Sequence, residues 1–149
     1  IKINIIRMIE YQKILDKNML NTFKDILDDI SKNGLSHNNH LYITFFTNHQ
    51  NVELPNWIKQ KYPEEMTIII QYEYYNLIVN KNNFSITLSF NDIKTNLKIG
   101  YDSIISFADP SADFGLILKN IKQKEIKKKL QSNNTKENNV INFSNYKKN

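Results

Sequence analysis

The segment LYITFFTNHQNVELPNWIKQKYPEEMTIIIQY, residues 41–72, contains two strand-forming runs separated by a loop. The first run, residues 41–47, is rich in the β-branched and aromatic residues that favour strands. The second run, residues 66–70, is apolar, too short for a free-standing helix and well suited to a buried strand. Pro55 cannot donate a ladder hydrogen bond, so the first strand must end before it. We therefore predict two strands with Trp57 in the loop between them, where its ring covers a core edge or contacts a ligand.

An amphipathic helix is predicted upstream of this segment, over residues 9–32. Its apolar residues recur at spacings of three and four, and Asn33 and Gly34 follow as a stop signal. The apolar stripe is wide for a helix of this length, so one side could pack on a sheet and the other on a second copy of the chain. A stripe that only faces the core is the alternative. For the dimer, we expect Phe23 and Leu27 to lie at the contact.

Further short strands are expected downstream. Residues 84–90 alternate apolar and polar side chains, which indicates a half-buried antiparallel strand. A hairpin turn is predicted before it at residues 80–83, because Asn tolerates positive φ. The remaining strands are predicted at residues 94–99, 103–108 and 114–118, with residues 72–75 as a connector and 77–79 as a short apolar run. One helix followed by five to seven strands indicates a mainly β fold, with a small antiparallel barrel or two-layer sheet over residues 41–118.

Length and composition limit the class of protein. A chain of 149 residues allows one domain with a proper core and is short for two. The absence of cysteine excludes a disulfide framework and fits a reducing cytoplasm. No apolar run approaches the roughly 18 residues that span a bilayer, so an integral membrane protein is not expected. Residues 1–8 lack the features of a signal peptide, and we expect them to be a disordered extension with Met8 as the natural start.

The net charge of +5 is unevenly distributed along the chain. Residues 119–149 carry nine lysines and two glutamates, whereas residues 1–118 have a balance of −2. A nucleic-acid-binding barrel normally carries positive charge on its own face, but here the basic character belongs to the tail. Residues 119–139 are predicted to be a disordered basic linker. Apolar residues return in residues 140–149, as in a peptide that docks on a partner; a last strand that folds back on the body is the alternative.

No catalytic or metal site is expected. The three histidines, His37, His40 and His49, have no carboxylate cluster nearby at ligand spacing. Asp109 and Asp113 bracket a proline turn, where aspartate routinely accepts backbone hydrogen bonds. The chain has only three glycines, so no loop is suited to cradling phosphate. We therefore expect a protein that is not an enzyme and needs no cofactor or metal.

What remains is surface suited to an extended peptide. Such a ligand needs donors and acceptors for its backbone and apolar pockets for alternate side chains. The sequence offers short polar residues beside aromatic ones, namely Gln71, Tyr72, Tyr74, Asn76, Ser85, Thr87 and Phe107. An ordinary half-exposed sheet face explains the same pattern equally well.

Four sequence blocks, in order, resemble the α-proteobacterial branch of the SspB family. They are HLYITFFTN at residues 40–48, VELPNWIKQKYPEEMTIIIQ at 52–71, FSITLSFNDI at 84–93 and ISFADPSADFGL at 105–116. The resemblance covers residues 9–118. Members of this family are cytoplasmic adaptors, not enzymes, which deliver tagged substrates to the ClpXP protease. The resemblance implies an SH3-like or Sm-like open barrel and a homodimer paired through its N-terminal helices.

The resemblance also implies two binding sites. A groove beside residues 70–76 and 84–87 is expected to hold the ssrA degradation tag, which adds Ile70 and Phe84 to the peptide-binding residues. The chain end is expected to dock on the ClpX unfoldase. The positions that match the family's docking peptide are Val140, Ile141, Asn142, Phe143, Ser144, Asn145, Tyr146, Lys147 and Lys148, with Phe143 where leucine is commoner. The linker departs from the long acidic linkers of the wider family, because it is shorter and basic. An Sm-like RNA-binding barrel with a basic tail is the alternative function.

Overall fold

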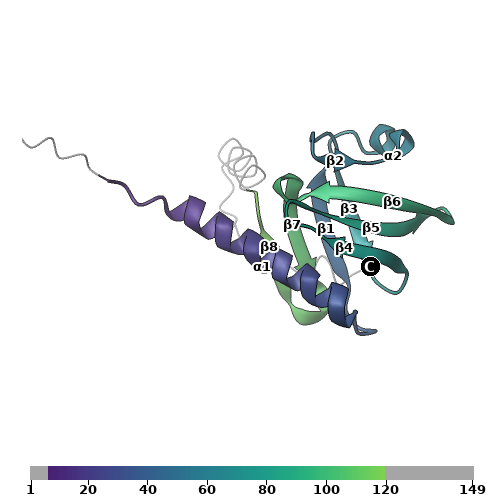
Figure 1. Ribbon diagram of the computed structural model, residues 1–149, viewed down its shortest axis with the longest axis horizontal. Helices are drawn as coiled ribbons and strands as arrows, with labels where there is room; N and C mark the ends of the chain where they lie inside the picture. Colours follow the sequence, from purple (N-terminus) through teal and green to yellow (C-terminus); the bar gives the residue numbers. More distant parts are fainter. Residues whose placement is uncertain (1–6, 120–149) are drawn as a thin grey trace, which may run out of the picture.

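The computed structural model describes residues 7–119 of the chain. A long helix precedes an array of antiparallel strands (Figure 1). In chain order the elements are α1 (Tyr11–Asn33), β1 (Leu41–Phe46), β2 (Val52–Glu53), α2 (Asn56–Lys61), β3 (Glu65–Ile70), β4 (Tyr74–Val79), β5 (Asn83–Phe90), β6 (Ile93–Gly100), the 3₁₀ turn η1 (Tyr101–Ser103), β7 (Ile104–Asp109), the 3₁₀ turn η2 (Pro110–Ala112) and β8 (Phe114–Ile117). The prediction of a mainly β fold with one N-terminal helix is confirmed. Neither α-helix in this part of the chain combines the length and apolar character needed to cross a bilayer.

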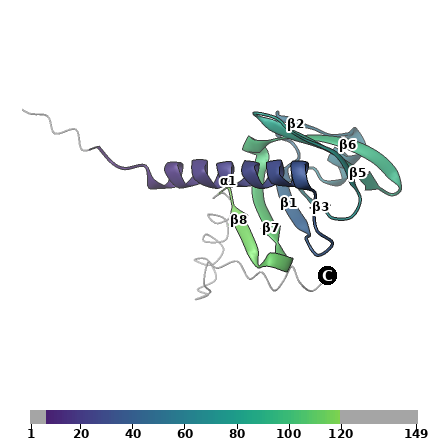
Figure 2. The ribbon, with the colours of Figure 1, turned by 60° about the horizontal axis from the view of Figure 1, so that its bottom comes forward.

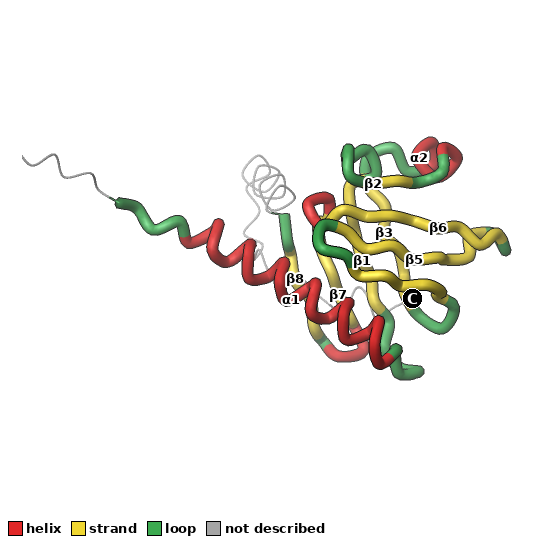
Figure 3. Tube along the Cα trace, in the orientation of Figure 1, coloured by secondary structure: helices red, strands yellow, loops and turns green. Residues whose placement is uncertain are grey.

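The strands form two four-stranded antiparallel sheets. The first, called sheet A, has the strand order β3-β1-β7-β8, and the second, called sheet B, has the order β2-β6-β5-β4 (Figure 3). The chain alternates between the sheets from β1 to β4, then completes sheet B before it returns to sheet A with β7 and β8. Because buried residues of both sheets belong to one cluster, the sheets share a single core.

Side-chain alternation decides which face of each sheet is apolar. In β1 every second residue is buried. Ile43 of β1 lies opposite Ile68 of β3 and Phe107 of β7, and all three are buried. In sheet B, Phe84 of β5 lies opposite Ile99 of β6, and both are fully buried. Directly opposite residues of antiparallel strands lie on the same face, so these sets define the two inner faces.

Helix α1 joins the two sheets through the ring of Phe23. Its centroid lies 6.1 Å from that of Phe84 in sheet B, 5.7 Å from that of Phe107 in sheet A and 6.4 Å from that of Tyr101 in η1. All three contacts are edge-to-face, a geometry that stabilises beyond simple burial of area. Only the C-terminal part of α1 lies against the sheets, whereas its N-terminal part extends beyond them (Figures 1 and 2).

The hairpin turns differ from the sequence prediction in their backbone conformation. The turn at residues 80–83 is present, since the Asn80 N–H donates to the Asn83 carbonyl at 2.8 Å. The prediction of positive φ within it is wrong, because the non-glycine residues with positive φ lie elsewhere. Asn91 and Asp92, between β5 and β6, have φ values of 51° and 64°. Positive φ at both central positions is the type I′ turn that matches the twist of a two-residue hairpin.

Element boundaries differ in three further places. α1 spans Tyr11–Asn33 rather than residues 9–32, and it ends at Gly34, whose φ is 77°. The two-residue strand β2 has no counterpart in the prediction, because two residues are too few to show a period of two. Tyr74 and Tyr75 belong to β4 rather than to a connector. With these changes the described residues contain eight strands rather than five to seven.

Tyr101 connects η1 to the turn before β5. Its side chain is only 3% exposed, and its hydroxyl donates to the Asn80 carbonyl at 2.7 Å. Burial, with a smaller contribution from the charge of Asp28, raises the pKa of Tyr101 to about 12. A tyrosine in an unfolded chain has a pKa near 10, so the folded state favours the neutral phenol. The stability that this phenol contributes is therefore fully present below about pH 10 and is lost as the pH rises towards 12.

We expect the free energy of unfolding to fall between about pH 10 and 12, by up to roughly 2–3 kcal/mol from this group alone. Tyr101→Phe should be about 1 kcal/mol less stable at neutral pH, because it lacks the buried hydrogen bond, but should show a shallower fall in alkali. Urea unfolding at a series of pH values measures both effects. Tyr11→Phe, at an exposed tyrosine, is the control and should follow the parent curve. A parent and a Tyr101→Phe curve that remain parallel would contradict the assignment.

Candidate peptide-binding site

Strands β3 and β4 are edge strands of different sheets, joined by a bend at residues 71–73. Among the described strands, β3 pairs only with β1, and β4 pairs only with β5. Helix α1 covers the second half of β4, where the Ser31 hydroxyl donates to the Leu77 carbonyl at 3.2 Å. Edge strands present backbone groups without ladder partners, and an extended peptide can add to such an edge as a further strand. The edge of β3 and the start of β4 are therefore suited to holding a peptide main chain.

A recess of about 250 Å³ lies beside these edges, between β3 and the C-terminal end of β5. Its lining residues come from β3, the bend and β5, and they are Thr67, Ile68, Ile69, Glu73, Leu88, Ser89 and Phe90. Ile68 and Leu88 are buried core residues, whereas Ile69 is 47% exposed. A volume of this size is below that of most small-molecule sites. It suits one or two apolar side chains of a peptide.

An aromatic pair adjoins the recess. The ring of Trp57 on α2 meets the ring of Phe90 edge-to-face at 6.1 Å, and Trp57 remains 40% exposed. Pro55 precedes α2 and fixes the backbone from which the helix starts. Trp57 thus covers an edge of the core and also presents apolar surface next to the recess, so both roles considered from the sequence remain compatible with its position.

Three of the predicted peptide-binding residues lie in the core. Ile70 and Phe84 are fully buried, and Phe107 is 2% exposed. Phe84 and Phe107 contact Phe23 of α1, and Ile70 lies opposite Leu41 on the inner face of sheet A. Because their side chains point into the shared core, these three residues could contact a surface peptide only through their main-chain atoms, and their place in the peptide-binding set stays a prediction.

Ser85 and Thr87 lie on the outer face of sheet B. They alternate with the buried residues of β5 and are half-exposed. Ser85 lies opposite Ile78 of β4, and Thr87 lies opposite Tyr75 and accepts a hydrogen bond from the Asn96 amide at 3.1 Å. This polar and aromatic face is a different surface from the recess, so the structure divides the predicted set into two groups.

The other predicted residues follow the connection from β3 to β4. Gln71 and Tyr72 lie in the bend, and Tyr72 is 68% exposed, with its ring 6.5 Å from that of His37. Tyr74 lies opposite Leu88, one of the residues that line the recess. Asn76 has a φ of 52° and lies where the β4–β5 register shifts. These four residues therefore border the same edge as the recess.

Several recess residues were not identified from the sequence, namely Thr67, Ile69, Glu73, Ser89 and Phe90. Residues 66–70 read as one buried apolar run, whereas in the structure the middle isoleucine, Ile69, points outward and its neighbours Ile68 and Ile70 point inward. An isoleucine on the outer face of an edge strand is the signal that alternation alone could have supplied. The sequence carries no local signal that the end of β5 lines the recess, because this depends on how the two sheets meet.

Titratable groups in the turns have structural partners. Asp109 is 5% exposed and accepts hydrogen bonds from the Ser111 N–H at 3.0 Å and from the Asn39 amide at 2.7 Å. The prediction that aspartate accepts backbone hydrogen bonds in this turn is confirmed. His49 has its Nε2 atom 3.8 Å from Asp102. Residues 7–119 contain no cluster of three or more histidine or carboxylate side chains placed to hold a metal ion.

The first turns of α1 and the segment just before it expose apolar side chains that the core does not use. Met8, Ile9, Tyr11, Ile14 and Leu15 are each more than half exposed. In contrast, Phe23 and Leu27, the residues predicted for a dimer contact, have no exposed surface. Their placement at an exposed contact is wrong, because the sheets of the same chain bury them.

The chain end predicted to dock on a partner, residues 140–149, lies outside the described residues. Residues 1–6 also lie outside them, as do residues 120–139 of the predicted basic linker. The positions Val140, Ile141, Asn142, Phe143, Tyr146, Lys147 and Lys148 therefore remain predictions from the sequence.

Comparison with family models gives a match over most of the chain. The family model described as SspB, stringent starvation protein B, matches residues 14–148. The match includes α1 from Ile14 onward, both sheets and nearly all of the chain that follows them. A search of curated proteins finds no match.

Proposed function

The chain belongs to the stringent starvation protein B (SspB) family, and we propose that it binds ssrA-tagged polypeptides and tethers them to the ClpX unfoldase. The family match supports a role in the ClpXP adaptor system, and the family is one of adaptors rather than enzymes. The finer steps, tag binding and tethering in the cytoplasm, are our proposal. In this mechanism no bond is made or broken by the chain itself.

The recess beside β3 carries the peptide-binding part of the proposal. The main chain of the tag adds to the edge of β3, where backbone groups are available. One apolar side chain of the tag enters between Ile68 and Leu88, and the exposed side of Ile69 packs along it. Main-chain pairing supplies affinity, and the small apolar recess supplies selection for side-chain size.

Tethering depends on the chain end. We propose residues 140–149 as the segment that docks on ClpX and residues 119–139 as the linker. When the tag and the chain end engage the same unfoldase, the second contact becomes intramolecular, with an effective concentration on the order of mM. The gain is a lower apparent KM for degradation of the tagged substrate.

The recess is tested by Ile69→Arg. The longer arginine side chain would occupy the recess and exclude the side chain of the tag, so we expect affinity for a fluorescent ssrA peptide to fall by about 2 kcal/mol or more. Fluorescence anisotropy measures the change, and circular dichroism checks the fold.

Ile78→Arg is the matched control. Ile78 is 53% exposed in β4 but lies opposite Ser85 on the outer face of sheet B, outside the recess. We expect this variant to bind the tag as the parent does. If Ile78→Arg loses binding and Ile69→Arg does not, the tag lies on the outer face with Ser85 and Thr87 instead.

Removal of residues 140–149 tests tethering. We expect tag affinity to be unchanged, because the recess is formed within residues 67–90. Stimulation of ClpXP degradation should be lost, and an excess of the shortened chain should inhibit degradation because it sequesters tags that it cannot deliver. Loss of tag binding on truncation would show that the segment is part of the folded body.

The exposed end of α1 supports a homodimer. Contiguous large apolar side chains at a surface mark interaction sites, and an isologous two-fold contact is the commonest way to bury such a surface. Two copies of α1 packed along residues 8–15 would cover Tyr11, Ile14 and Leu15 without disturbing the core.

A pair of substitutions on α1 separates the dimer contact from the core. Leu15→Glu, at a 52% exposed position, should give a folded monomer. Phe23→Glu should fail to fold, because an unpaired carboxylate would replace a fully buried ring. Light scattering at tens of micromolar and circular dichroism give the two readouts. A monomeric parent at that concentration would overturn the dimer proposal.

A further inference from the structure

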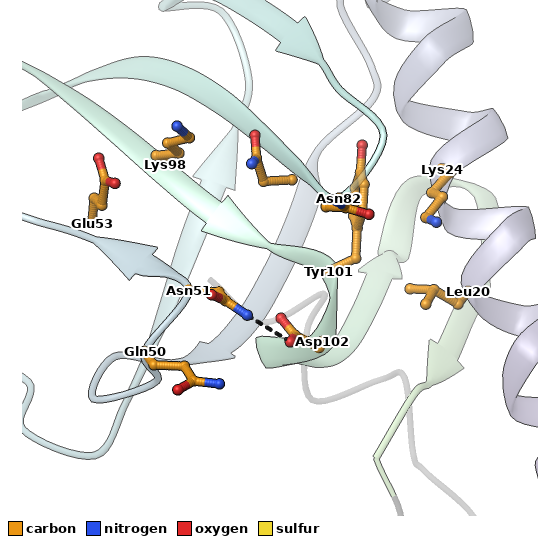
Figure 4. Close-up of a pocket in the computed structure, with 10 residues that line it drawn as sticks. Leu20, Lys24, Gln50, Asn51, Glu53, Asn82, Lys98, Tyr101 and Asp102 are labelled. Atoms are coloured by element: carbon orange, nitrogen blue, oxygen red, sulfur yellow. Dashed lines mark hydrogen bonds between the residues drawn. The ribbon is translucent and has the colours of Figure 1, made fainter.

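A second, larger pocket of about 510 Å³ lies at the other end of β5, where α1 passes the start of η1 (Figure 4). It shares no lining residue with the recess beside β3. Its walls come from α1, the β1–β2 loop, β2, β6, η1 and the turn before β5. Lys24 reaches in from α1 on one side, and Gln50, Glu53 and Lys98 lie on the other (Figure 4). Unlike the recess, this pocket is lined mainly by amide and charged side chains.

The floor of the pocket is held by hydrogen bonds. The Gly100 N–H donates to the Asn51 carbonyl at 2.9 Å, and the Tyr101 N–H donates to the Asn82 carbonyl at 3.1 Å. The Asn51 amide donates to the Asp102 carboxylate at 2.9 Å (Figure 4). Glycine is required at position 100, because a Cβ atom there would lie 2.7 Å from the Cβ of Asn51. These contacts fix the loop against η1, so the pocket is formed before any ligand arrives.

The rim, in contrast, carries polar groups with unused bonding capacity. The side chains of Gln50, Glu53, Asn82 and Lys98 make no hydrogen bond or ion pair with another described residue. A primary amide offers donors and an acceptor in the geometry of a peptide group. Gln50 and Asn82 can therefore pair with the main chain or side-chain amides of a bound polypeptide.

The charges in the pocket are not all balanced. Asp102 is held by Asn51 and lies 3.8 Å from His49, and Glu53 lies opposite Lys98 in the β2–β6 register. Lys24 forms no ion pair with a described residue, and its Nζ atom lies 4.7 Å above the ring centroid of Tyr101. The ammonium groups of Lys24 and Lys98 are thus both available for an anion. A carboxylate can accept a charge-assisted hydrogen bond from either of them.

We propose that this pocket is a second peptide site, which binds a carboxylate-bearing stretch of an extended polypeptide through Lys24, Gln50 and Asn82. The inference rests on the proposed function, because the polypeptide is the client that the adaptor carries. A nucleotide fits less well, since Tyr101 is 3% exposed and its ring is not free to stack on a base.

The two sites lie at opposite ends of β5, roughly 20 Å apart along an extended strand. A client that fills both needs about six residues between its apolar and acidic parts.

The test is a titration of the ¹⁵N-labelled full chain with two blocked pentapeptides, acetyl-Gly-Glu-Gln-Glu-Gly-amide and its all-glutamine counterpart, acetyl-Gly-Gln-Gln-Gln-Gly-amide. We expect saturable backbone shifts at Asn51, Asn82 and Asp102 with the acidic peptide and weaker ones with the neutral peptide. Lys24→Met should weaken acidic-peptide binding by about tenfold, the loss expected for one charged hydrogen bond. Lys94→Met is the matched control, because Lys94 lies 4.3 Å over the ring of Tyr75 but outside the pocket.

Three outcomes would overturn the proposal: no shifts at peptide concentrations up to about 1 mM, shifts that map elsewhere, or equal weakening by Lys24→Met and Lys94→Met. Titration with the ssrA peptide in parallel separates this inference from the proposed function. If the ssrA peptide binds and the acidic pentapeptide does not, the second site is wrong and the adaptor proposal stands. If only the acidic pentapeptide binds, the pocket is a peptide site and the adaptor proposal fails.

Discussion

The structure depends on the burial of Phe23 between the two sheets. Its ring contacts Phe107 from sheet A, Phe84 from sheet B and Tyr101 from the turn that links them. Because buried residues of α1 and of both sheets belong to one cluster, the helix completes the core that the two sheets share. Loss of so large a buried ring typically costs 3–5 kcal/mol, which is a large part of the stability of a small domain. The helix is therefore part of the core and not an appendage to it.

This arrangement also determines which strand edges and pockets stay exposed. The edge strands of the two sheets are β3, β8, β2 and β4, and the C-terminal half of α1 covers the later part of β4 but leaves its start uncovered. The apolar recess lies beside β3, and the amide-lined pocket lies at the opposite end of β5, next to Lys24 of the same helix. One surface is suited to an apolar side chain, and the other is suited to amide and carboxylate groups.

The apolar residues near the N-terminal end of the helix are exposed. Phe23 and Leu27 are buried and stabilise the fold. The apolar residues between Met8 and Leu15 are exposed and are available to a second copy. The apolar side chains thus divide into a buried and an exposed set along the length of the helix rather than around its circumference. The sequence therefore indicated apolar surface beyond what one sheet needs, but it placed the expected exposed contact at residues that the core buries.

The sequence by itself determined the local structure. Spacings of three and four specified α1, a period of two specified β5, and Asn-containing turns marked both ends of β5, since each of these depends on neighbours in the chain. The order of four sequence blocks was also sufficient to indicate the family. Only the tertiary structure decided that Phe84 and Phe107 face the core, that Ile69 faces outward, and that β3 meets the end of β5 in a recess. The reason is physical: alternation shows which residues share a face, but the burial of that face depends on elements far away in the sequence.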